Sequence, residues 1–196
     1  MTDRNGSSAT IYFSRGPREV LKMFRLLNFV AYQLAWFACV LGAAHHLASA
    51  GAAFAIAVTA VHLALRREAS ELRLVACAAA IGFLVDSALV RAHFVEFASA
   101  SLDGWAPFWM VSLWMAFATT LNHSLRWLTS RPWVATLSGA IGGPLAYLAG
   151  AKLGAMTLAS PVPAMLLIAG LWAVAMGILS LLTLVRTGAA ERRVPA

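Results

Sequence analysis

Six long apolar runs, separated by short polar segments, make up most of the chain. Each run is close to the length of about 20 residues that a helix needs to cross the hydrocarbon core of a bilayer. The runs cover residues 26–46, 49–65, 72–94, 106–127, 133–154 and 162–185, and the second is the shortest. Small and polar residues recur within them at helical spacing. The pattern therefore predicts an all-α fold, a polytopic transmembrane bundle of about six helices.

The polar flanks divide the chain into three parts. We expect a loose cytoplasmic N-terminal tail over residues 1–20, a six-span transmembrane domain over 21–186 and a basic cytoplasmic C-terminal tail over 187–196. Pro17 suits the first turn of a helix, so a short amphipathic segment along the membrane surface precedes the first span.

Composition and charge agree with a lipid environment. Hydrophobic residues make up 61% and charged residues 12%, against about 45–50% and about 25% in soluble domains. The net charge of +7 comes from basic residues in both tails and in alternate loops, and only Arg91 and Lys152 lie toward the opposite side. This asymmetry predicts an inner-membrane protein with both termini in the cytoplasm. The charge thus reflects topology and attraction to membrane lipids, and no nucleic-acid partner is expected.

Glycine is concentrated in the fifth run. Gly139 and Gly143 form one row at helical spacing, and a second row begins at Gly142 and continues through Gly150. Small residues four apart allow transmembrane helices to approach closely, so we expect this helix to be the central one. Pro144 predicts a kink, which is either static or a hinge.

Asp86 is the strongest single chemical signal, because it lies near the middle of the third run. An aspartate there costs about 2.5–3.5 kcal/mol on insertion scales unless it is paired or protonated. Three roles remain open: a structural ion pair with Lys152 or Arg91, a proton- or ion-coupling site, and a catalytic or ligand-binding acid. In each case we expect Asp86 to point into the bundle within reach of Tyr147 or Lys152.

A second polar layer lies nearer the cytoplasmic side and contains His62, Asn122 and His123. Two imidazoles could bind a metal, but no carboxylate is expected at their depth and no His-x-x-His spacing is present. We therefore interpret them as hydrogen-bonded packing histidines and predict no metal and no cofactor.

The tryptophans fall into two groups by depth. Those at positions 105, 109, 127 and 133 are expected in the interfacial belts. Trp36, Trp114 and Trp172 lie deeper, where we expect them to pack in the bundle or line a pocket.

The chain carries no phosphate-binding glycine loop, no Gly-x-Ser-x-Gly and no paired carboxylates. We therefore expect a protein that binds, transports or presents a lipid-like or amphipathic molecule. One alternative is a membrane enzyme acting on lipids or acyl chains, with Asp86 as its acid or base and Tyr147 as a donor. Another is an accessory subunit or homo-oligomer that associates through its small-residue face. The candidate ligand-binding residues are Asp86, Trp114, Asn122, His123, Tyr147 and Lys152.

Several blocks, in order, resemble a known family: Asn28-Phe29 with Tyr32-Gln33, Gly82-x-x-x-Asp86-Ser87, Pro107-x-Trp109 and Gly-Gly-Pro-Leu-Ala-Tyr-Leu-Ala-Gly from Gly142. The chain is similar to the bacterial membrane family DUF2878, a domain of unknown function. The resemblance covers nearly the whole chain and is weakest over residues 49–65 and both tails. It implies a small bacterial inner-membrane protein. Genes of the family often lie beside enzymes resembling cyclopropane-fatty-acyl-phospholipid synthases, which points toward lipid modification.

Overall fold

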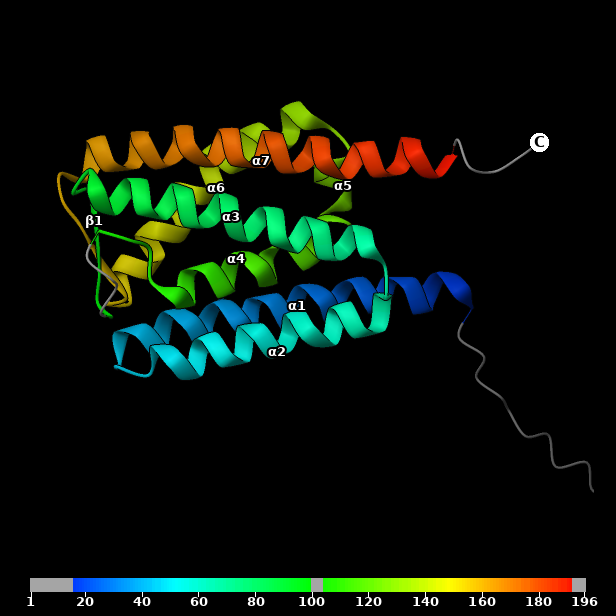
Figure 1. Ribbon diagram of the computed structural model, residues 1–196, viewed down its shortest axis with the longest axis horizontal. Helices are drawn as coiled ribbons and strands as arrows, with labels where there is room; N and C mark the ends of the chain where they lie inside the picture. The colour runs from blue at the N-terminus through cyan, green and yellow to red at the C-terminus, as the bar shows by residue number, and fades with distance from the viewer. Residues whose placement is uncertain (1–15, 100–103, 192–196) are drawn as a thin grey trace, which may run out of the picture.

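The protein is an elongated bundle of nearly parallel and antiparallel helices (Figure 1), known here from a computed structural model that describes residues 16–99 and 104–191. The elements are α1 (Pro17–Ala44), α2 (Ala48–Arg66), α3 (Ala69–Arg91), β1 (Val95–Phe97), α4 (Phe108–Leu121), α5 (Arg126–Thr129), α6 (Pro132–Lys152), β2 (Met156–Leu158) and α7 (Pro161–Glu191). The predicted all-α class is confirmed.

Five helices, namely α1, α2, α3, α6 and α7, are long and apolar enough to cross a membrane. The fourth predicted span does not reach that length, because α4 has only 14 residues and is followed by a turn and the four-residue α5. α4 ends where side chains form hydrogen bonds to other helices: Asn122 donates to Glu71 of α3, and Ser124 donates to Asn28 of α1. A helix enclosed by other helices does not need to match the thickness of the lipid.

The central helix is α4, so the prediction that the glycine-rich fifth span occupies the centre is wrong. α4 packs against α1, α2 and α3 and lies between them in the bundle (Figure 1). Eleven of its residues are buried. α6 instead packs mainly against α7 and exposes Leu137, Ile141 and Leu145 on its other side. Glycine content thus marks one close contact rather than the centre of the bundle.

That close contact joins α6 to α7. A side chain at Gly139 or Gly143 would run into Trp172 of α7, whereas a side chain at Gly142 would meet open space. Only the first of the two predicted glycine rows therefore has Trp172 against it. α6 remains one helix from Pro132 to Lys152, with Pro144 inside it.

A two-stranded ribbon closes the end of the bundle where α3 and α6 finish (Figure 1). β1 and β2 pair antiparallel, with Glu96 opposite Thr157. The sequence analysis did not predict these strands, because segments of three residues are too short to show an alternating pattern.

Both ends of the described chain lie at the same end of the bundle, opposite the ribbon (Figure 1). The helical start at Pro17 is confirmed, so residues 17–20, predicted as part of the loose tail, belong to α1. α7 continues to Glu191, so residues 187–191, predicted as tail, belong to a helix. Residues 1–15 and 192–196 of the predicted tails lie outside the described residues.

Candidate functional site

Asp86 lies fully buried in the bundle and joins three helices. Tyr147 of α6 donates its hydroxyl to Asp86 Oδ1, and Trp114 Nε1 of α4 donates to Asp86 Oδ2 at 3.0 Å. The predicted contact between Asp86 and Tyr147 is therefore confirmed. A carboxylate in an apolar interior is tolerated when its oxygens accept hydrogen bonds, and here each oxygen has a donor.

Lys152 does not take part in this arrangement. It is exposed at the end of α6, and among the described residues it forms no ion pair with Asp86. Arg91 lies over the ring of Trp105 at 4.3 Å. Neutral donors rather than cations therefore hold Asp86, and its role as an acid or a ligand stays a prediction.

An aromatic wall stands beside Asp86. The rings of Trp114 and Trp172 stack with centroids 4.4 Å apart, and the edge of Phe117 packs on both. Trp172 also contacts the ring of Tyr147 edge to face, at 6.4 Å between centroids. These contacts join α4, α6 and α7 around a single group of rings.

This wall lines a narrow pocket with a cavity volume of about 40 Å³. A cavity needs only about 10–15 Å³ to hold one water molecule. The lining comes from α1, α4, α6, α7 and β2: Tyr32, Trp36, Val40, Trp109, Met110, Leu113, Trp114, Phe117, Ala146, Tyr147, Met156 and Trp172. Of these, Tyr32 and Trp36 on α1, Ala146 on α6 and Trp172 on α7 are half-buried, so we place the mouth of the pocket between α1 and α6, beside Trp172.

The prediction that the deeper tryptophans line a pocket is confirmed, while the interfacial position of the others stays a prediction. Trp36, Trp114 and Trp172 line this pocket as expected. Trp127 and Trp133 are 67% and 65% exposed, which suits an interfacial belt. Trp109 differs, because it is buried and donates to Ser99 at 2.7 Å.

One buried polar atom of the pocket lining lacks a well-aligned partner. Trp172 Nε1 makes no hydrogen bond of acceptable geometry to any residue that the structure describes, although the Tyr147 hydroxyl lies close enough to interact with it. A buried N–H group without an acceptor costs about 1–3 kcal/mol. The pocket therefore offers a mostly apolar surface that includes one buried N–H group without a well-aligned acceptor and the hydroxyl of Tyr32.

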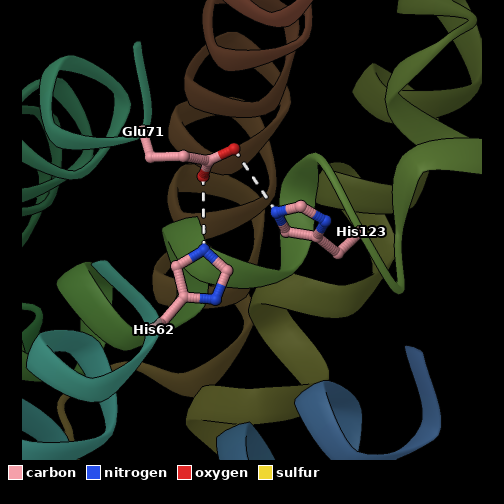
Figure 2. Close-up of side chains that lie close together, drawn as sticks. All are labelled: His62, Glu71 and His123. Carbon is pink, nitrogen blue, oxygen red and sulfur yellow. Dashed lines mark hydrogen bonds and ion pairs between the residues drawn. The ribbon is translucent and has the colours of Figure 1, made fainter. Parts of the chain in front are cut away.

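A second polar group, separate from the pocket, contains Glu71 between His62 and His123 (Figure 2). Glu71 is fully buried, with His62 Nε2 at 3.3 Å from one oxygen and His123 Nε2 at 3.3 Å from the other. Asn122 donates to Glu71 Oε1 at 3.1 Å. Two of the predicted site residues, Asn122 and His123, thus lie here and away from Asp86.

The sequence analysis missed Glu71, and its expectation that no carboxylate lies near the histidines is wrong. Glu71 stands in the first turn of α3 beside charged residues, a position typical of solvent-exposed acids. The available signal was its separation of nine residues from His62 across a tight turn. An antiparallel pair of helices places two such positions at the same level.

The fold and its apolar helices define the class of protein: an α-helical, multi-pass membrane protein. Within that class, the model of the family described as "Protein of unknown function (DUF2878)" matches residues 25–178. The chain belongs to this family, which confirms the resemblance seen in the sequence. Searches of curated proteins and of solved structures found no match.

Proposed function

We propose that this protein binds a lipid-like or amphipathic molecule in the pocket between α1 and α6. The observation that supports this most directly is the buried N–H group of Trp172, which lacks a well-aligned acceptor in a mostly apolar, aromatic lining. Ligand pockets commonly combine such a lining with a few polar groups that fix orientation. A ligand that carries a hydrogen-bond acceptor would satisfy Trp172 and bury its apolar part against the rings.

The size of the pocket restricts the ligand. A cavity of about 40 Å³ holds about three water-sized groups, so it admits only the end of a slender apolar segment and not a bulky headgroup. The mouth between α1 and α6 lies on the side of the bundle, where Leu34 and Leu145 are exposed. A molecule dissolved in the bilayer would enter there without leaving the hydrocarbon. We infer a neutral polar group, such as an ester, carbonyl or hydroxyl, next to the apolar segment.

The arrangement of Asp86 favours binding over catalysis. Both of its oxygens already accept hydrogen bonds, and the carboxylate lies behind Trp114 and Tyr147 rather than in the pocket lining. In this proposal Asp86 is a positioning residue that fixes two rings of the wall. Transport or presentation of the bound molecule would follow from exchange with the bilayer through the open side.

We also propose the cytoplasmic membrane of a bacterium as the location, with both termini in the cytoplasm. This proposal is supported by basic residues, such as Arg67 and Arg131, near the end of the bundle where the first and last helices begin and end.

Native mass spectrometry of the detergent-solubilised protein tests the binding proposal. We expect a one-to-one small-molecule adduct on the wild-type protein that survives exchange of the detergent. Ala146→Leu fills the pocket mouth and Trp172→Phe removes the donor, so both should reduce the adduct. Trp133→Phe, at an exposed position outside the pocket, should retain it. An adduct that is unchanged in both pocket variants would contradict the proposal.

A further inference from the structure

The local fold explains why two histidines and a glutamate meet near the end of the bundle that lies opposite the two-stranded ribbon. α2 ends at Arg66, and Arg67 adopts a left-handed conformation with φ 49°. The chain then reverses directly into α3, which brings Glu71 opposite His62. His123 follows the early end of α4 and approaches from the other side (Figure 2).

The three side chains form a ligand set that suits a metal ion. One donor atom from each lies within 4.8 Å of the others, and all three residues are buried. Zinc binds imidazole nitrogen at about 2.0–2.1 Å and carboxylate oxygen at about 2.0–2.2 Å, so tetrahedral ligands are about 3.3–3.4 Å apart. Each histidine Nε2 lies 3.3 Å from a Glu71 oxygen. These two distances are close to the edge of a tetrahedral site, although each is measured to a different oxygen of Glu71.

A second observation comes from His123. Its side chain is only 7% exposed, and its Nε2 lies near Glu71 without a hydrogen bond of acceptable geometry to any described residue. His123 Nε2 therefore lies 3.3 Å from a Glu71 oxygen, but its orientation does not allow a direct N–H···O hydrogen bond. A cation between the two would give His123 Nε2 a partner.

We propose that His62, Glu71 and His123 bind a divalent transition metal of the zinc type. Two histidines and one carboxylate leave a fourth position open for water or another ligand. Fifteen positions separate Glu71 from Asp86, which is about 22 Å along α3. The metal site is thus distinct from the aromatic pocket and does not depend on the function proposed for it.

Arg66 sets a condition on this site. Its Nη2 lies 3.4 Å from His123 Nδ1, and a guanidinium can only donate. Metal at Nε2 requires the proton on Nδ1, so Arg66 must turn away when the ion binds. Its positive charge also opposes a cation. Arg66 therefore competes with the metal, and Arg66→Gln, whose side-chain oxygen can accept from Nδ1–H, should tighten binding.

The test uses the full chain without a polyhistidine tag, in detergent, after treatment with a chelator. Isothermal titration with Zn²⁺ should give one ion per chain, and Co²⁺ should give the visible absorption of a four-coordinate ion. Loss of a supporting partner alone lowers metal affinity about 10–100-fold. We therefore expect Glu71→Gln and His62→Gln to weaken Zn²⁺ binding by at least about 100-fold.

Two further variants complete the test. His93→Gln, an exposed histidine beyond the far end of α3, should leave the affinity unchanged. Arg66→Gln should tighten it by about tenfold. The proposal is overturned if the wild-type protein takes up no stoichiometric Zn²⁺, a result that does not depend on the folding of any variant. It is equally overturned if folded Glu71→Gln, checked by circular dichroism, binds Zn²⁺ as the wild type does.

Discussion

The hydrogen bond from Tyr147 to Asp86 should contribute measurably to stability, because one buried carboxylate joins α3, α4 and α6. Tyr147→Phe keeps the ring against Trp172 and removes only the hydroxyl that donates to Asp86 Oδ1. A hydrogen bond to a charged group is worth about 1.5–3 kcal/mol. Bonds inside membrane proteins average only about 0.6 kcal/mol, with a maximum near 1.7. We expect a loss of about 1.5–1.7 kcal/mol, where the two ranges overlap.

A double-mutant cycle isolates this interaction. In an Asp86→Leu background the Tyr147 hydroxyl has lost its acceptor, so Tyr147→Phe should there be neutral or stabilising. The free energy of unfolding is measured in detergent micelles by denaturant titration, followed by circular dichroism. Tyr32→Phe is the matched control, since this phenol lines the same pocket and its hydroxyl makes no hydrogen bond to a described residue. The control should change stability by less than about 0.5 kcal/mol.

One result would refute this reasoning. If Tyr147→Phe costs the same in the wild type and in Asp86→Leu, the two groups are not coupled, and Asp86 does not hold the three helices through Tyr147. Asp86→Asn gives an additional check, because the amide can accept from Trp114 and donate to the Tyr147 oxygen. It should therefore fold and lose less stability than Asp86→Leu.

Two further predictions concern packing and topology. Gly143→Leu should destabilise the protein by about 1–3 kcal/mol through overpacking against Trp172. Gly142→Leu is the control and should change stability little, because open space lies beside Gly142. Equal melting temperatures for the two variants would show that α6 and α7 do not meet at Gly143. Reporter fusions after residue 196 and in the loop 98–104 should read cytoplasm and periplasm respectively, and the same compartment for both would refute the proposed topology.

The sequence predicted the helices well, because lipid imposes a simple rule on composition and length. The apolar runs located the long helices of the described residues, and Pro17 marked the start of α1. The runs did not show where α4 ends, since its polar end at Asn122 bonds to Glu71 from a different helix. Such a contact between distant segments leaves no periodic pattern in the chain.

The helix at the centre of the bundle also could not be predicted from glycine content. Small residues permit close approach on one side only, and in α6 that side meets Trp172 of α7. α4 is central because large residues such as Trp109 and Phe117 pack around it in several directions. Which helix is surrounded by the others depends on how all the helices are arranged. The spacing of residues within one helix does not specify that arrangement.

The candidate site was half predictable. The position of Asp86 in mid-span showed that it needs a partner, and Tyr147 at a similar depth was the correct choice. Glu71 was not identified, because an acid in the first turn of a helix usually faces solvent. Its burial follows from the turn at Arg67 and from the short length of α4, both of which are tertiary features.

The most direct measurement of the central claim is an experimental structure of the protein purified without removal of its native lipids. The account predicts elongated density in the pocket between α1 and α6, with an acceptor within hydrogen-bond distance of Trp172 Nε1. A pocket that is closed by the side chains of Tyr32 and Ala146, with Trp172 Nε1 bonded to a protein group, would contradict it.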